Sequence, residues 1–258
     1  MIPKVIHYCW FGRNPLPKEA LRCIRSWKIC CPDYEIIQWN EDNFDLSKCP
    51  VYVQQAYEAK KWAFVSDYAR LKIIYENGGI YVDTDVEFLK APDSLLSHKA
   101  YFGFEDAGIH INTGLGFGAE KGTAVLKRMM ADYADIPFIN PDGTPDETTC
   151  PQRNTAALLE LGMKREDMIQ VLPGDILILP REYLCPVGYW HHTDCITENS
   201  ISVHWYTATW LPDEYRRQRA DKLKKLKRQR QQERLRLLPK QLAYKLIGEK
   251  NLRKWKKG

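Results

Sequence analysis

The stretch that decides the fold is Gly78-Gly79-Ile80-Tyr81-Val82-Asp83-Thr84-Asp85. The two glycines follow residues 62–77, in which apolar residues recur with helical spacing. They can adopt the positive φ angles that end a helix and that residues with a side chain rarely adopt. Ile80 to Val82 then form a short apolar run that is typical of a buried strand. A helix that passes through a double glycine directly into a strand is typical of an α/β fold with a mostly parallel sheet.

The segments on either side extend this pattern. The helix over residues 62–77 is expected to be amphipathic, with one apolar stripe made of Phe64, Tyr68, Leu71 and Tyr75. Strands are expected at residues 4–11, 34–39, 80–82, 100–104, 171–179 and 200–205, and further helices at residues 18–28, 121–134 and 152–161. The sequence therefore predicts one α/β domain over residues 1–215.

Charge divides the chain into two parts. Residues 1–215 contain 20 basic and 30 acidic residues, whereas residues 216–258 contain 18 basic and 3 acidic residues. The second part is rich in Arg, Lys, Gln and Leu, which favours a basic amphipathic helical tail bound to an anionic membrane surface. A nucleic-acid partner is not expected, because the acidic body repels phosphates and no recognised reader motif occurs.

The N-terminal residues do not have the continuous apolar core of a secretory signal, and no run of about 18 apolar residues occurs. The sequence therefore predicts a cytoplasmic protein, associated peripherally with the inner face of the cell membrane. In that compartment the eight cysteines are expected to be free thiols.

Asp83 and Asp85 form a carboxylate pair at the predicted strand end. If the extended conformation continues through Thr84, both side chains point to the same side. Two carboxylates on the same side of a strand lie close enough to repel each other unless a cation or protons neutralise them. Oxygen ligands favour Mn²⁺ or Mg²⁺. The pair falls at the carboxyl edge of the sheet, where α/β folds bind their ligands, and diphosphate oxygens are natural further ligands.

Asp67 and Arg70 lie one helical turn apart on the preceding helix, on one face. One interpretation is a surface ion pair worth at most about 1 kcal/mol. The alternative is that the double glycine directs this helix and its charged pair towards the strand end that carries Asp83 and Asp85.

Four blocks resemble the sugar-binding DXD region of glycosyltransferase family 32, which includes bacterial capsular-polysaccharide transferases and yeast mannosyltransferases. The most specific are residues 63–70 (AFVSDYAR) and 78–85, and the others are the opening 2–12 and the closing 204–210. The chain is also similar to the core of the large clostridial glucosylating toxins. This resemblance implies a GT-A nucleotide-sugar-binding fold and transfer with retention of anomeric configuration.

The resemblance also implies roles for individual residues. Asp85 is expected to bind the metal directly, and Asp83 to contact the ribose and the metal shell. Asp67 and Arg70, which complete the expected catalytic set with these two, would bind the hydroxyls and phosphate of the donor. The remaining matched positions are Trp10 against the base, Asn112 near the transferred sugar, His204 as a third metal ligand, and Trp210 as a lid over the diphosphate.

The implied reaction moves a hexose from a UDP-sugar to a lipid-linked glycan acceptor during surface polysaccharide synthesis. A same-face mechanism is preferred, although Asp67, Glu105 and Asp106 all stay open as a carboxylate nucleophile. Two other functions also stay open. One is a haloacid-dehalogenase-type phosphatase that uses the Asp83/Asp85 pair, and the other is a non-catalytic metal-binding scaffold.

Overall fold

The computed structural model describes residues 1–106, 108–188 and 196–207, with the single residues 214, 215, 217, 218, 221, 225 and 228. Contacts divide the chain into one unit from Met1 to Trp210 and another from Leu211 to Gly258. The predicted basic tail over 216–258 lies almost wholly outside the described residues, so the tail and its boundary stay predictions. Within the described part, none of the helices has the length and apolar character that a membrane span requires.

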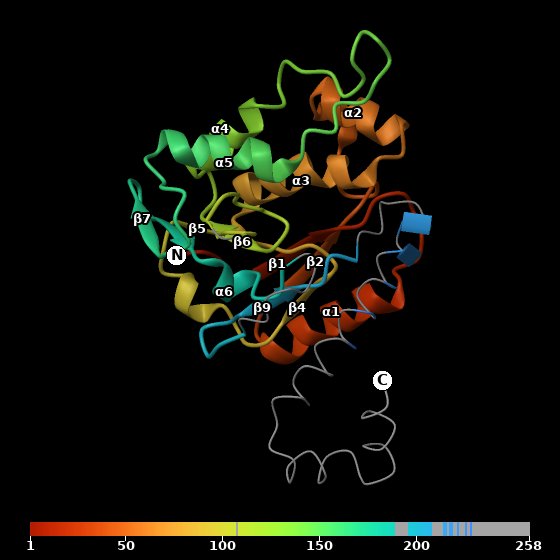
Figure 1. Ribbon diagram of the computed structural model, residues 1–258. Helices are drawn as coiled ribbons and strands as arrows, with labels where there is room; N and C mark the ends of the chain where they lie inside the picture. The colour runs from red at the N-terminus through yellow and green to blue at the C-terminus, as the bar shows by residue number, and fades with distance from the viewer. Residues whose placement is uncertain are drawn as a thin grey trace, which may run out of the picture. The chain divides into compact units, whose positions relative to one another are not determined.

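A central sheet organises the first unit (Figure 1). Seven strands of the described part form it in the order β2-β1-β3-β6-β5-β8-β7, and β4 and β9 pair separately. The strands are β1 (Val5–Cys9), β2 (Glu35–Trp39), β3 (Gly79–Tyr81), β4 (Val86–Phe88), β5 (Ala100–Gly103), β6 (Phe117–Ala119), β7 (Gln170–Leu172), β8 (Ile176–Leu179) and β9 (Ser202–His204).

The directions of the strands confirm the expected α/β class with a mostly parallel central sheet. β1 runs parallel to β2 and to β3, and β5 runs parallel to β8. β6 is antiparallel to both β3 and β5, and β7 is antiparallel to β8. β6 therefore joins two groups of strands that point the same way, and the sequence patterns did not predict it.

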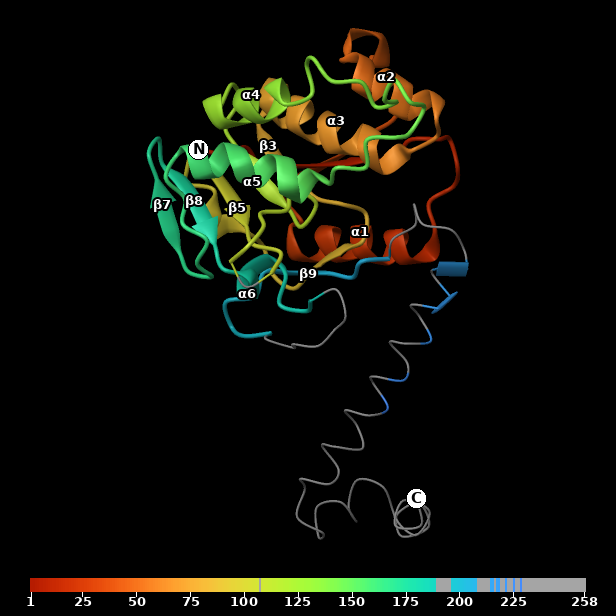
Figure 2. The ribbon, with the colours of Figure 1, turned by 45° about the horizontal axis from the view of Figure 1, so that its top comes forward.

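Helices cover both faces of this sheet. α3, α4 and α5 lie together on one face, whereas α1 lies on the other face beside β4 and β9 (Figure 2). The helices are α1 (Lys18–Cys30), α2 (Val51–Glu58), α3 (Trp62–Asn77), α4 (Ala124–Ala131), α5 (Cys150–Glu160) and α6 (Arg181–Leu184), with short 3₁₀ turns at η1 (Leu46–Lys48) and η2 (Asp93–Leu95). α2 is a second element that the patterns missed.

The expectation that α3 is amphipathic with one apolar stripe is wrong. Phe64, Tyr68 and Leu71 of that stripe are buried, but so are residues on the other sides of the helix. These others are Val65, Asp67, Ala69, Arg70, Ile73 and Ile74. The physical reason is that α3 packs against α2, α4, β1 and β3 at once, so most of its circumference faces protein.

His7 and the double glycine fix the passage from α3 into β3. Gly78 and Gly79 both have positive φ, at +72° and +104°, and a Cβ on Gly79 would lie 2.9 Å from His7 Nε2. The His7 side chain is buried, and its Nδ1 accepts a hydrogen bond of 3.0 Å from Trp39 Nε1. Nε2 therefore carries the proton and donates to the Gly78 carbonyl at 3.1 Å. A neutral imidazole satisfies both partners.

We expect this neutral histidine to make the fold sensitive to acid. Burial lowers the pKa of His7 to about 4 from its ordinary 6.5. Between these values the unfolded state binds more protons than the folded state, so the free energy of unfolding falls as the pH falls. Between pH 7.5 and pH 4.5 the loss from this residue should be about 2 to 3 kcal/mol. Urea unfolding of the wild type and of His7→Gln at both pH values measures it, and equal pH dependence in the two proteins would contradict the prediction.

Candidate metal centre

A turn brings Asp83 and Asp85 together, and the expectation that they share one side of an extended strand is wrong. β3 ends at Tyr81, and the Val86 N–H donates to the Asp83 carbonyl at 3.0 Å, which closes a turn through Thr84. Two other segments hold this turn. The Asp83 N–H donates to the Gly114 carbonyl at 3.2 Å, and the Trp205 N–H donates to the Asp85 carbonyl at 3.0 Å.

His204 joins the carboxylate pair from a distant part of the sequence. β4 begins directly after the turn, and its pairing with β9 sets Val86 opposite His204. As a result Asp83, Asp85 and His204 each offer a ligand atom, and these atoms all lie within 4.8 Å of one another. This cluster is named the metal group below.

Asp85 is the most firmly held member of the metal group. Its Oδ1 lies 2.9 Å from His204 Nε2, and its Oδ2 accepts hydrogen bonds from the Thr207 N–H at 2.8 Å and the Thr207 hydroxyl at 3.0 Å. Burial raises the pKa of Asp85, but the attraction of His204 and these hydrogen bonds outweigh it and lower the pKa to about 2. Burial lowers the pKa of His204, and the same Asp85 more than compensates, so that pKa is raised. Asp85 is therefore an ionised carboxylate that His204 and Thr207 hold in place.

The residues of the metal group fit a divalent cation. Two carboxylates and one imidazole form an oxygen and nitrogen donor set of the kind that binds Mn²⁺ and related ions. Asp83 and Asp85 repel each other, and a cation removes that repulsion. The buried Nδ1 of His204 has no hydrogen-bond partner among the described residues, so this imidazole has unused bonding capacity.

Arg70 connects α3 to the metal group. Its Nη2 lies 2.8 Å from Asp67 Oδ1 and 3.4 Å from Asp83 Oδ1, and the Arg70 and Asp67 side chains are 4% and 12% exposed. Its Nε donates to the Ser66 carbonyl at 3.1 Å. The guanidinium also lies over the Tyr81 ring, 5.0 Å from the centroid. The interpretation as a surface ion pair is therefore wrong, because the pair is buried beside the metal group.

Burial also shifts the pKa values of the carboxylates around Arg70. It raises the pKa of Asp67 to about 6, against the lowering effect of Arg70. It raises the pKa of Asp83 as well, and the neighbouring Asp85 adds to that rise. The Tyr81 hydroxyl donates to Asp83 Oδ1 at 2.9 Å. Arg70 thus lies between the buried carboxylate of Asp67 and the partly buried carboxylate of Asp83, and Tyr81 also binds Asp83.

The segment 112–114 closes the other side of this space. Asn112 Oδ1 accepts a hydrogen bond from the Gly114 N–H at 2.6 Å. A Cβ on Gly114 would overlap Asp83 Oδ2 and lie 3.0 Å from Arg70 Nη1. Cys150, at the first turn of α5, lies 3.8 Å from Arg70 Nη1 and 3.7 Å from Asn112 Oδ1 through its sulfur. Glycine is required at position 114 because the carboxylate occupies the space of a side chain.

The structure thus brings together six of the eight predicted site residues. The six are Asp67, Arg70, Asp83, Asp85, Asn112 and His204. Trp10 follows β1 at the same edge of the sheet, but its indole Nε1 donates to the Asn14 carbonyl at 2.6 Å. Trp210 lies outside the described residues. The roles given to all eight stay predictions.

Four contributing residues were missed from the sequence: Tyr81, Gly114, Cys150 and Thr207. Strand alternation could have found Tyr81, since it lies two residues before Asp83.

The surroundings of Asp106 and Glu105, two of the candidates for a carboxylate nucleophile, differ. Asp106 Oδ1 accepts from the N–H groups of Ile109 and His110, which engages it in its own loop. Burial raises the pKa of Glu105, whose side chain is within hydrogen-bonding reach of Asn112.

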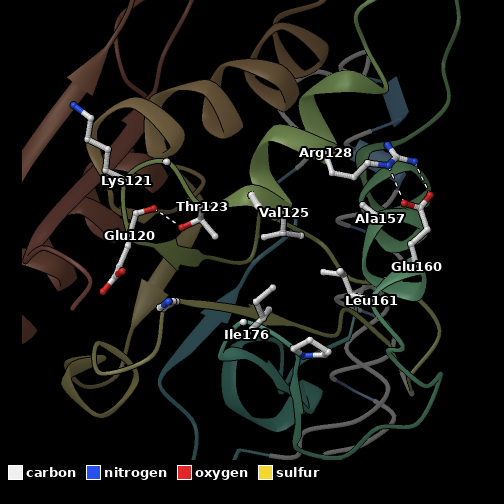
Figure 3. A pocket seen from close by; sticks show the side chains of 14 residues that line it. Glu120, Lys121, Thr123, Val125, Arg128, Ala157, Glu160, Leu161 and Ile176 are labelled. Carbon is white, nitrogen blue, oxygen red and sulfur yellow. Dashed lines mark hydrogen bonds and ion pairs between the residues drawn. The ribbon is translucent and has the colours of Figure 1, made fainter.

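A separate cavity of about 670 Å³ lies at the opposite edge of the sheet (Figure 3). It is lined at the beginnings of β5 and β8 by Lys99 and Ile176, and the ion pair between Arg128 and Glu160 borders it at 2.6 Å. None of the predicted site residues lines this cavity. The cavity therefore belongs to a part of the molecule that the metal group does not use.

Comparison with known proteins identifies the region that carries most of the metal group. Residues 17–102 match a glycosyltransferase sugar-binding region containing a DXD motif. The chain is 32% identical over 104 residues to inositol phosphoceramide mannosyltransferase 3 of Schizosaccharomyces pombe, covering 39% of this chain and 29% of that protein. It is also 33% identical over 111 residues to inositol phosphoceramide mannosyltransferase 1 of the same organism, covering 39% of this chain and 33% of that protein. The chain thus spans about a third of the length of the curated relatives it matches.

Solved structures give more distant likenesses. The PaToxG glycosyltransferase has a TM-score of 0.48 at 19% identity, covering 62% of this chain and 69% of that chain. A glycosyltransferase involved in glycosylation of the major capsid of PBCV-1 has a TM-score of 0.45 at 14% identity, covering 86% of this chain and 100% of that chain. The sequence match contains Asp67, Arg70, Asp83 and Asp85, so the resemblance to DXD-containing glycosyltransferases is confirmed.

Proposed function

We propose that this chain, which carries the sugar-binding DXD region of glycosyltransferases, transfers a hexose from a UDP-sugar to a glycan acceptor with the aid of Mn²⁺ or Mg²⁺. One observation supports this most strongly. The metal group lies directly against the buried Asp67–Arg70 pair, with Arg70 Nη2 3.4 Å from Asp83 Oδ1. A cation site beside a fixed guanidinium and a carboxylate suits a diphosphate joined to a sugar.

Each residue then has a chemical task. A bound cation supplies Lewis-acid stabilisation of the departing diphosphate. Arg70, whose orientation is fixed by Asp67 and Ser66, donates to a phosphate oxygen as negative charge develops there. Asp67 accepts hydrogen bonds from the sugar hydroxyls, and Asp83 holds the ribose. The space over segment 112–114 receives the sugar ring.

Retention of configuration is part of the proposal. In a same-face mechanism the acceptor hydroxyl attacks from the side that the diphosphate leaves, and the diphosphate takes its proton. This preference is supported by the state of the carboxylates, because Asp67 is tied to Arg70 and Asp106 to its own loop. Glu105 is the remaining candidate for a nucleophile.

The acceptor is proposed to be lipid-linked and part of a surface polysaccharide. The two curated relatives are named for action on inositol phosphoceramide, a lipid. The strongly basic composition of residues 216–258 supports peripheral association with an anionic membrane.

The phosphatase and scaffold alternatives receive less support. A phosphatase that uses Asp83 and Asp85 leaves the buried Asp67–Arg70 pair without a task, and residues 17–102 match a sugar-binding region. A non-catalytic scaffold would bind a metal without turnover. The phosphatase would therefore give a different product from the proposed reaction, and the scaffold would give no product.

The test is a screen of nucleotide-sugars for hydrolysis with and without Mn²⁺. UDP-hexoses should release UDP and free sugar in equal amounts, and EDTA should stop the reaction. GDP-mannose belongs in the screen because both relatives are named mannosyltransferases. Release of phosphate from a generic aryl phosphate would support the phosphatase instead, and metal binding without any turnover would support the scaffold.

A further inference from the structure

Helix α1 has two sharply different faces. Ala20, Cys23, Ile24 and Trp27 are buried, and Trp27 Nε1 donates to the Val86 carbonyl at 2.7 Å. The residues that point away from the protein recur every three or four positions, so they share one stripe. They are Lys18, Leu21, Arg22, Arg25, Lys28 and Ile29, all exposed, and the exposed Glu19 lies at the edge of this stripe. This stripe is named the outer face of α1 below.

The outer face of α1 is basic although the rest of its unit is acidic. It carries four Lys and Arg side chains, while residues 1–215 as a whole contain 30 acidic and 20 basic residues. Arg22 is engaged, with Nη2 3.5 Å from Glu87 and the guanidinium 5.3 Å from the Trp205 ring. Lys18, Arg25 and Lys28 have no ion pair within the described part of the chain. Their charges are therefore available to an anionic partner.

Two aliphatic side chains lie among these cations. Leu21 is 50% exposed and Ile29 is 71% exposed. A helix that alternates basic and aliphatic residues on its outer face matches a membrane surface, because the cations meet lipid phosphates and the aliphatic groups enter the acyl boundary. Exposed aliphatic groups give no comparable gain on a nucleic-acid phosphate backbone.

We propose that the outer face of α1 docks on an anionic lipid bilayer. α1 is fixed to the strand that begins after the metal group, because the Phe88 N–H donates to Ser26 Oγ at 2.9 Å in addition to the Trp27 contact. Within the described residues of the first unit, β4 is the element that packs most extensively against α1. Docking through α1 thus holds the metal group at a set height above the bilayer. The inference does not depend on sugar transfer or on residues 216–258.

The experiment compares full-length variants for binding to vesicles of 30% phosphatidylglycerol in phosphatidylcholine. Leu21→Gln/Ile29→Gln removes the aliphatic groups without a change of charge, and its matched control, Met168→Gln/Val171→Gln, alters two residues that are 50% and 62% exposed elsewhere. Arg25→Gln/Lys28→Gln removes two charges, and its control is Lys127→Gln/Lys164→Gln, also on exposed residues. We expect each α1 variant to lower the partition coefficient at least tenfold, and each control to change it less than twofold.

Two results would overturn the proposal. If the aliphatic variant binds vesicles like its control, the face does not enter a bilayer, and a loss confined to the charge variant would show electrostatic attraction to the headgroups alone. If the charge variant binds like its control, the cations of this face do not attract the bilayer and the proposed docking on anionic lipid is wrong. Hydrolysis of UDP-hexose by the same proteins without vesicles is a separate readout, so failure of the proposed reaction is distinguished from failure of docking.

Discussion

Asp85→Asn lowers kcat/KM for metal-dependent hydrolysis of the nucleotide-sugar on the order of 10³-fold, or about 4 kcal/mol. Asp85 is the carboxylate with the lowest pKa in the metal group, at about 2, so it remains charged throughout the useful pH range. The amide removes a charge that the metal needs. It also presents an N–H₂ group where Oδ2 now accepts two hydrogen bonds from Thr207. Steady-state kinetics over a range of Mn²⁺ concentrations measures the effect.

The matched control is Asp135→Asn, an exposed aspartate outside the metal group that should retain full activity. Titration of Mn²⁺ into both variants, followed by calorimetry, separates lost metal binding from lost catalysis. Circular dichroism checks that Asp85→Asn is folded. Activity within tenfold of the wild type, or unchanged Mn²⁺ affinity, would show that Asp85 is not the principal ligand.

Local sequence patterns predicted the backbone elements that carry the metal group and the Asp67–Arg70 pair. The transition from α3 through Gly78 and Gly79 into β3 could be predicted because two positive-φ residues mark it and an apolar run follows. The positions of Asp67 and Arg70 one helical turn apart followed from helical periodicity. These features depend on neighbours within a few residues along the chain, which is the range over which sequence patterns are informative.

Features that depend on distant segments could not be predicted in this way. The turn at Thr84 is held because Gly114 and Trp205 bind its backbone from segments about 30 and about 120 residues further along the chain. β6 was missed because Phe117-Gly118-Ala119 has no strand-like pattern. Gly118 is required by the Tyr101 ring, which lies 2.5 Å from where its Cβ would be. The buried state of the Asp67–Arg70 pair likewise depends on how α3 packs.

Arg70→Leu lowers the free energy of unfolding by about 3 to 5 kcal/mol, because it leaves the buried carboxylate of Asp67 and the partly buried carboxylate of Asp83 without their cation. Asp67 loses an ion pair of 2.8 Å, and Asp83 loses a neighbour at 3.4 Å. Burial already raises the pKa of Asp67 to about 6 while Arg70 opposes that rise, so the pKa should rise further in the variant. Urea unfolding at pH 6 and pH 8 measures the loss at each pH.

The sign of the pH dependence follows from this rise. An aspartate whose pKa is higher in the folded state binds more protons there, so stability falls as the pH rises towards that folded pKa. The variant, with its higher pKa, continues to lose stability above pH 6, and its deficit relative to the wild type should be larger at pH 8 than at pH 6. Asp67→Asn in the Arg70→Leu background should recover part of the loss, since it removes the unpaired charge.

Arg128→Leu provides the matched comparison. Arg128 also contacts two carboxylates, Asp132 and Glu160, but its side chain is 40% exposed. Water screens such pairs, so this variant should lose at most about 1 kcal/mol and show little change in pH dependence. If Arg70→Leu costs no more than Arg128→Leu, then burial has not made the Asp67–Arg70 pair a structural requirement. The position of Arg70 beside the metal group would then be maintained for ligand binding alone.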